Sequence, residues 1–142
     1  MTRWVLDTDH VSLWQRGHPQ VSRQIENRGI TLIATTVITA EEQLRGRLDV
    51  IRRTGSGEIR VVAYARFRET LYFLTQISQI LEFSTEAEDC FAALKQQKIR
   101  IGAQDLRIAA IALSVNGTVV TRNRRDFEKV PNLLIEDWSI ET

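Results

Sequence analysis

The chain has 142 residues, of which 43% are apolar and 26% are charged, and its formal net charge is +1. This length and composition favour one globular domain with a substantial core, and they exclude binding to nucleic acid through a large net positive charge. The single cysteine excludes an internal disulfide, no apolar run reaches the length of a membrane span, and no signal-peptide pattern is present, so we expect a cytoplasmic protein.

Strands and helices are predicted to alternate along the chain. Short runs rich in Ile, Val and Thr predict strands, and apolar residues at helical spacing predict helices. This alternation is typical of an α/β domain with a mainly parallel central sheet. In chain order we expect a strand at 4–7, helices at 10–16 and 20–28, a strand at 30–39, helices at 40–53 and 59–81, a strand at 82–84, helices at 85–98 and 103–116, a strand at 118–121, a helical turn at 124–130 and a strand at 133–137.

The glycine turn TGSGE at 54–58 joins two of these helices, which are predicted to form an αα-hairpin inserted between strands. Residues 45–68 contain seven arginines and only two acids, Asp49 and Glu58. Such a pattern is typical of a solvated helix face, with at most a role in binding a partner.

Four acids lie near the places where predicted elements begin or end. Asp7 ends the first strand, Glu42 lies just after the second, and Asp126 follows TVVT. Asp105 opens the helix at 103–116. In open parallel sheets, function gathers beyond the carboxyl ends of the strands, so these acids are candidates for one shared site.

Each acid also has an ordinary structural explanation. Asp9 or Thr8 can cap the helix after the first strand, a helix dipole favours acids in a first turn, and Asp126 can pair with a neighbouring arginine. Four carboxylates at one edge, however, repel each other unless cations neutralise them, and oxygen ligands suit Mg²⁺ or Mn²⁺. Such ions activate water for phosphodiester cleavage without a histidine. His10 and His18 lack metal-ligand spacing, so we expect them at the surface or in capping positions.

Five motifs run through the chain in order: LDTDH (6–10), ITAEEQLRG (38–46), GAQDLRIAAIAL (102–113), VVTRNRRDFEKV (119–130) and LLIEDW (133–138). In order and spacing they resemble the motifs of PIN-domain ribonucleases of the VapC toxin type. The resemblance implies a single PIN domain over residues 1–142, with a PIN-like α/β/α sandwich. It also implies an Mg²⁺- or Mn²⁺-dependent endoribonuclease that acts on RNA, pairs with a small DNA-binding antitoxin and forms a homodimer, with the αα-hairpin as the region of protein contact.

The resemblance assigns a role to particular residues. The family has its second acid three residues after a threonine and four before a glycine, which selects Glu42 over Glu41. The catalytic and metal-binding residues would be Asp7, Glu42, Asp105 and Asp126, supported by Thr121, Asn123 and Asp9. Arg122, Arg124 and Arg125 are candidates for contacts with RNA phosphates, or else Arg124 or Arg125 forms a surface pair with Asp126 or Glu128.

Three alternatives remain open at this point. A DNA-cleaving or structure-specific nuclease of the same fold would need the same acids, because metal-assisted cleavage of a phosphodiester needs no 2′-hydroxyl. A non-catalytic PIN scaffold would bind RNA or protein only. The DTD element also resembles the nucleophile motif of haloacid-dehalogenase-type phosphatases, but His10 stands soon after it where a threonine or valine is expected, and no later acid pair is present.

Overall fold

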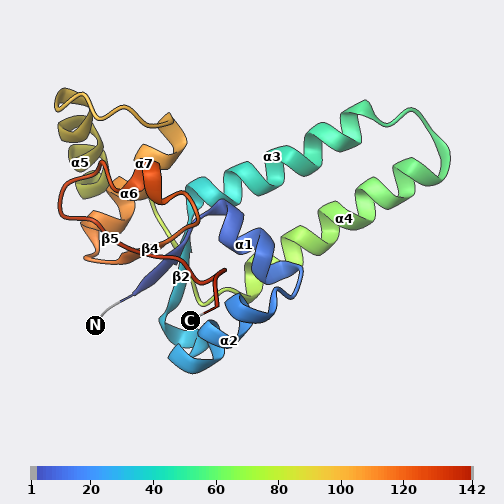
Figure 1. The fold of residues 1–142 in the computed structure, drawn as a ribbon. Helices are drawn as coiled ribbons and strands as arrows, with labels where there is room; N and C mark the ends of the chain where they lie inside the picture. The colour runs from blue at the N-terminus through green and yellow to red at the C-terminus, as the bar shows by residue number, and fades with distance from the viewer. Residues whose placement is uncertain (1–2, 142) are drawn as a thin grey trace.

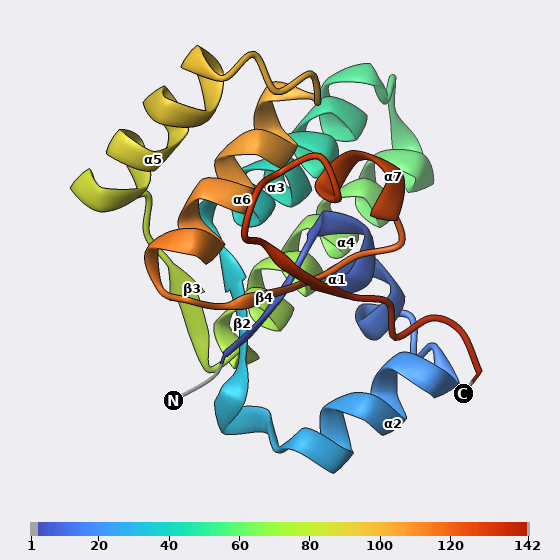
Figure 2. The same ribbon diagram turned by 60° about the vertical axis from the view of Figure 1, so that its left-hand side comes forward.

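The computed structural model describes residues 3–141, which form an α/β/α sandwich (Figure 1, Figure 2). Five parallel strands make one sheet in the order β3-β2-β1-β4-β5. The predicted fold class is therefore confirmed. The elements are β1 (Trp4–Leu6), α1 (Thr8–Gln15), α2 (Pro19–Arg28), the 3₁₀ helix η1 (Ile30–Leu32), β2 (Ile33–Thr36), α3 (Val37–Arg53), α4 (Gly57–Gln76), β3 (Gln79–Leu81), α5 (Thr85–Gln96), α6 (Ala103–Ser114), β4 (Thr118–Val120), α7 (Arg124–Phe127) and β5 (Leu134–Glu136).

Two hydrophobic cores lie on the two faces of the sheet. Successive side chains of a strand point to opposite faces, so Val5 and Val119 pack with helices α5 and α6. Leu6 and Val120 pack on the other face with helices α1 and α2. All four side chains are fully buried, as the strands of a parallel sheet covered on both faces should be. Packing on both faces holds the strands in place, and with them the edge of the sheet at which their carboxyl ends lie.

Helices α3 and α4 form the predicted αα-hairpin, which extends away from the rest of the molecule (Figure 1). Arg47 in α3 donates from Nε to Oγ1 of Thr70 in α4, over 3.1 Å, and so ties the two helices together. Helix α4 exposes apolar side chains toward its tip, including Ile59 and Val61 at 68% each. None of the helices within residues 3–141 combines the length and the apolar character that crossing a membrane requires.

The predicted strand at 30–39 is too long at both ends. Residues Ile30–Leu32 form the 3₁₀ helix, and α3 begins at Val37. The cause at the second boundary is a cap, because the Thr36 hydroxyl accepts a hydrogen bond from the backbone N–H of Thr39 over 3.1 Å. Threonine favours strands by propensity, but here its hydroxyl begins a helix.

The predicted helix at 59–81 and the predicted strand at 82–84 are also wrong at their shared boundary. Helix α4 ends at Gln76, and the strand that follows is Gln79–Leu81. Pairing with β2 decides this change, since Thr35 and Ile80 are partners in the parallel ladder. Tertiary pairing thus overrides a helical period that continues past the end of the helix.

Candidate active site

Three neighbouring parallel strands deliver the candidate acids to one edge of the sheet. Strand β1 lies between β2 and β4, and its last residue is followed at once by Asp7. Glu42 follows β2, in the second turn of α3, and Asp126 follows β4, in α7. The chain adds strands on one side of β1 and then on the other, so β1 and β4 form the topological switch point where ligands bind in such sheets.

Asp7 is the N-cap of helix α1 as well as the end of β1. Its Oδ1 accepts a hydrogen bond from the backbone N–H of His10 over 2.9 Å, and only 5% of the residue is exposed. The structural alternative in which Asp9 or Thr8 caps this helix is therefore wrong, because the cap is Asp7. The cap holds the carboxylate in one position at the center of the sheet edge.

The two adjacent glutamates of α3 have different partners. Thr8, which follows Asp7 in the sequence, donates a hydrogen bond from its Oγ1 to Oε1 of Glu42 over 2.6 Å. Glu41 instead pairs with Arg45 and accepts from Nε2 of Gln104 over 3.2 Å. Neighbouring helical residues point about 100° apart, which accounts for this separation. The structure thus brings Glu42, and not Glu41, to the loop that carries Asp7.

The loop after β4 joins the other two acids through Asn123. Its Nδ2 donates to Oδ2 of Asp126 over 3.0 Å and to Oδ2 of Asp105 over 3.3 Å. The fully buried Thr121 shapes this loop, because its Oγ1 accepts from the backbone N–H of Asn123 over 2.9 Å. Thr121 and Asn123 therefore position α7 against the first turn of α6, where Asp105 lies.

The charges of the other three acids act on the carboxyl group of Asp105. The pKa of its carboxyl group is raised to about 6, first by burial and then by the negative charges of Asp7 and Glu42. The negative charge of Asp126 contributes a smaller rise to the same value, and the hydrogen bond from Asn123 opposes these effects. Asp7, Glu42 and Asp126 are thus each close enough to Asp105 to repel its negative charge. A divalent cation relieves such repulsion, and a set of carboxylate oxygens is the ligand type that Mg²⁺ and Mn²⁺ prefer.

The raised pKa of Asp105 predicts a pH-dependent loss of stability when metal is absent. The unfolded chain releases this proton near the usual value of 3.8, whereas the folded chain holds it up to about 6. Between these values the folded state binds more protons, so the free energy of unfolding should fall as pH rises through this window. Denaturant unfolding in EDTA from pH 4 to pH 7 measures this slope. The Asp105→Asn variant should show a flatter slope, and an equal slope would contradict the prediction.

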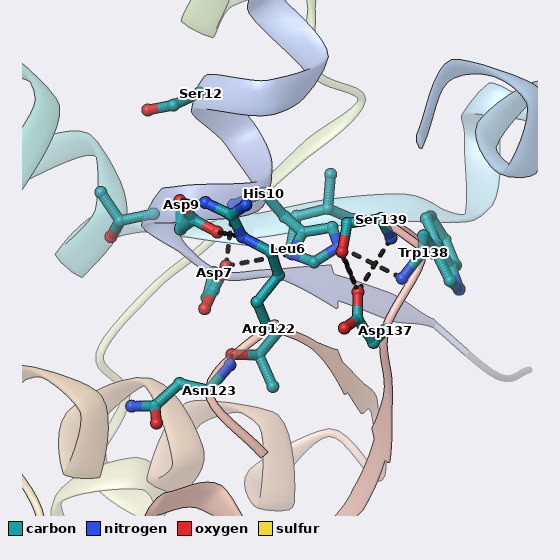
Figure 3. Close-up of polar contacts among 12 residues, drawn as sticks. Leu6, Asp7, Asp9, His10, Ser12, Arg122, Asn123, Asp137, Trp138 and Ser139 are labelled. Atoms are coloured by element: carbon teal, nitrogen blue, oxygen red, sulfur yellow. Dashed lines mark hydrogen bonds and ion pairs between the residues drawn. The ribbon is translucent and has the colours of Figure 1, made fainter. Parts of the chain in front are cut away.

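Within residues 3–141, one group of three potential metal ligands has its ligand atoms all close together, and it consists of Asp7, Asp9 and His10. Single ligand atoms of Asp7, Asp9 and His10 lie within 4.8 Å of one another (Figure 3). His10 is fully buried, so the expectation of a surface or capping position is wrong for it. Its Nε2 accepts from the backbone N–H of Trp138 over 3.2 Å, which leaves the proton on Nδ1, facing Asp7 Oδ1 at 3.6 Å. Neither nitrogen then offers a lone pair to a metal.

His18 does act as a cap, as expected. Its Nδ1 accepts from the backbone N–H of Val21 at the start of α2, over 3.4 Å. The different fates of the two histidines follow from their places in the fold, since His10 faces the segment after β5 and His18 lies in the loop between two helices.

Asp9 is held by an arginine of the loop after β4. Arg122 donates from Nε and Nη2 to the two oxygens of Asp9 over 2.6 and 2.8 Å (Figure 3). These hydrogen bonds lower the pKa of Asp9, with smaller contributions from nearby charges. The pair spans 113 positions of sequence, and it fastens α1 to the loop that carries Asn123.

The other two arginines of this segment differ in their partners. Arg124 pairs with Glu128 over 3.4 Å, as one of the sequence alternatives expected. Asp126 pairs instead with Lys129, over 3.7 Å. Within residues 3–141 no ion pair involves Arg125. Both side chains are exposed, and their proposed contact with RNA stays a prediction.

The sequence is similar to a known protein family and to characterised proteins. A family described as PIN domain matches residues 4–133. Ribonuclease VapC2 of Rickettsia felis is 36% identical over 70 residues, which are 46% of this chain and 52% of that relative, so the chain spans about half of its length. The tRNA(fMet)-specific endonuclease VapC of Salmonella typhimurium is 26% identical over 97% of this chain and 99% of that relative.

Solved structures of low sequence identity share the fold. The DNA-bound VapBC structure of Salmonella typhimurium matches with a TM-score of 0.74 at 24% identity, over 97% of this chain and 99% of that one. VapBC-1 of Haemophilus influenzae matches with a TM-score of 0.75 at 19% identity, over 98% and 100%. VapBC2 of Rickettsia felis, bound to a fragment of promoter DNA, gives 0.72 at 24% identity, over 96% and 99%.

Proposed function

The chain belongs to the PIN domain family, and on that basis we propose that it is a VapC-type toxin, a metal-dependent endoribonuclease that hydrolyses RNA phosphodiester bonds. The relatives named as VapC ribonucleases support the reaction class. The observation that carries the metal dependence is the raised pKa of Asp105, to about 6, in the field of three further acids.

Each of the four acids would hold the metal, Mg²⁺ or Mn²⁺, through carboxylate oxygens. Such an ion, when bound, supplies charge neutralisation and lowers the pKa of water. The chain's own contribution is to keep the carboxylates in position before metal and substrate arrive. The His10 N–H holds Asp7, the Thr8 hydroxyl holds Glu42, and the amide of Asn123 holds the remaining pair, Asp105 and Asp126.

Incubation of the purified protein with RNA tests the proposal. We expect cleavage of RNA in Mg²⁺ or Mn²⁺ and loss of cleavage in excess EDTA, with recovery when metal is restored. Bacterial tRNA and a single-stranded RNA oligonucleotide serve as substrates, and a DNA oligonucleotide of the same sequence serves as the control for substrate class. Undiminished cleavage in EDTA would exclude the metal mechanism, and cleavage of DNA alone would assign the fold to a DNase.

The αα-hairpin of α3 and α4 is the proposed region of contact with protein partners, namely a small DNA-binding antitoxin and a second copy of the chain. Its support is the run of exposed apolar residues on a helix that extends away from the body, including Ile59, Val61 and Tyr72 at 68% exposed each. Light scattering should give the mass of a dimer at micromolar concentration. A monomeric mass throughout that range would contradict homodimerisation.

A further inference from the structure

A polar cavity of about 360 Å³ lies between helices α1, α3 and α4, at the base of the hairpin. Three of its lining residues are arginines, Arg16, Arg47 and Arg66, and one is an acid, Glu69. The remaining lining residues are neutral and polar: Ser12, Gln15 and Gln43. A cavity with this lining carries an excess of positive charge and several hydrogen-bond donors, which suits an anion rather than an apolar ligand.

The three arginines of this cavity are not engaged by acids. In the part of the chain that the structure describes, no carboxylate oxygen lies within 4.0 Å of their guanidinium nitrogens, whereas Arg28, Arg45, Arg122 and Arg124 all have such a partner. Glu69 lines the same cavity but remains beyond that distance. An arginine can contact a phosphate through two parallel hydrogen bonds, and here this capacity is left free.

Arg47 is held in place for such a contact. Its Nε donates to the hydroxyl of Thr70, which is 1% exposed, so the guanidinium is fixed while its terminal nitrogens remain available. Gln43 is fixed in the same way, because its Nε2 donates to Oγ of Ser12 over 2.8 Å and to the carbonyl of Thr8 over 3.3 Å. The cavity wall is thus ordered in the absence of a ligand, which reduces the entropy lost on binding.

The cavity adjoins the acidic site along two helices. Ser12 lies one turn beyond Thr8 on α1, and Gln43 follows Glu42 on α3, with Arg47 one turn further. One helical turn is roughly 5 Å, a separation that a neighbouring nucleotide of an RNA strand can span.

We propose that this cavity binds a backbone phosphate of the RNA substrate, one that flanks the phosphodiester cleaved at the acidic edge. The proposal rests on the nuclease function proposed above, and it adds a second subsite built by Arg16, Arg47 and Arg66. A phosphate held there would fix the position of the strand without reading its bases. It would also draw the strand toward an edge whose four acids otherwise repel it.

Binding of a single-stranded RNA oligonucleotide in EDTA, at several salt concentrations, tests this subsite without cleavage. The double variant Arg16→Gln, Arg66→Gln removes two exposed charges and leaves Arg47 to join the helices. We expect weaker binding and a log–log salt dependence that is shallower by about 0.7, because the loss of one phosphate contact on a single strand accounts for roughly that amount. The variant Glu69→Gln should strengthen binding, since it removes the one negative charge of the cavity.

A matched control separates this subsite from a general effect of charge. The variant Arg52→Gln, Arg68→Gln removes two arginines that lie outside the cavity, one on α3 and one on α4, and it should bind RNA nearly as the wild type does. In Mg²⁺ the cavity variant should show a raised KM with little change in kcat. Equal salt slopes for cavity and control variants would overturn the subsite while leaving a cleaving wild type as a nuclease. A wild type that neither binds nor cleaves RNA would overturn both proposals.

Discussion

Replacement of Asp7 by asparagine is expected to lower the rate of RNA cleavage by at least about 100-fold, because loss of a residue that only supports a metal ligand already costs about 10- to 100-fold. Asp7 follows the central strand β1 and is the most buried of the four acids. Asparagine caps a helix about as well as aspartate does, so the hydrogen bond from His10 should survive. The variant removes one of four mutually repelling charges, and its thermal unfolding temperature should equal or exceed that of the wild type.

The adjacent glutamates provide a matched pair for the same cleavage assay. Glu42→Gln should remove most activity, since Glu42 is the residue that Thr8 brings to the loop of Asp7. Glu41→Gln should have little effect, because Glu41 lies with Arg45 and Gln104. Equal losses of activity from the two variants would contradict the assignment of Glu42, rather than Glu41, as the glutamate of α3 that faces the site. Full activity of Asp7→Asn would refute the role of the edge itself.

Replacement of Trp138 by alanine is expected to lower the free energy of unfolding by about 3–5 kcal/mol, the usual cost of truncating a large aromatic side chain in a core. Trp138 is 2% exposed and packs against Trp4 with 6.3 Å between ring centroids. Its indole Nε1 donates to Glu136 over 2.8 Å, and the guanidinium of Arg28 lies 4.7 Å from the ring. The side chain therefore joins β1, α2 and the segment after β5.

Urea unfolding followed by circular dichroism measures this loss. Ile140→Ala is the control, because Ile140 lies two positions further along the same segment but is 57% exposed, and it should change stability by less than about 0.5 kcal/mol. Trp138→Phe should fall between the two, since phenylalanine keeps most of the apolar contact and loses the hydrogen bond to Glu136. A loss below about 1 kcal/mol for Trp138→Ala would show that this segment is not part of the core.

Periodicity and strand composition predicted the fold class because both are local signals. The errors in boundaries arose where distant contacts decide. Thr36 has the β-branched side chain of a strand, yet its hydroxyl caps α3. Leu81 continues the apolar helical pattern of α4, yet it pairs with Thr36 of β2. Neither partner can be identified from the segment itself, so a reading of propensity extends the strand in one case and the helix in the other.

In the candidate site, too, local signals in the sequence are informative and contacts between distant segments are not predicted. Order and spacing of motifs predicted the residues that gather at the edge, but not what holds them. Thr8 donates a hydrogen bond to Glu42, but the sequence shows only that Thr8 lies between Asp7 and Asp9. The burial of His10 depends on Trp138, and the partner of Asp9 is Arg122; each contact joins opposite ends of the chain. The arginines of the cavity come from three helices, and their isolation from acids is visible only in space.

The four acids are far apart in the sequence, so the ribosome adds them to the growing chain at different times. Asp126 is made 119 residues after Asp7, and Asp105 lies 98 residues after it. At about 5–20 residues per second, the ribosome completes the last of these acids on the order of 6–24 s after the first. Strand β1 also needs β4 beside it, and such long-range parallel pairing is slow to form. A nascent chain therefore lacks the edge on which cleavage is proposed to depend until synthesis has passed Asp126 and β4 has paired with β1.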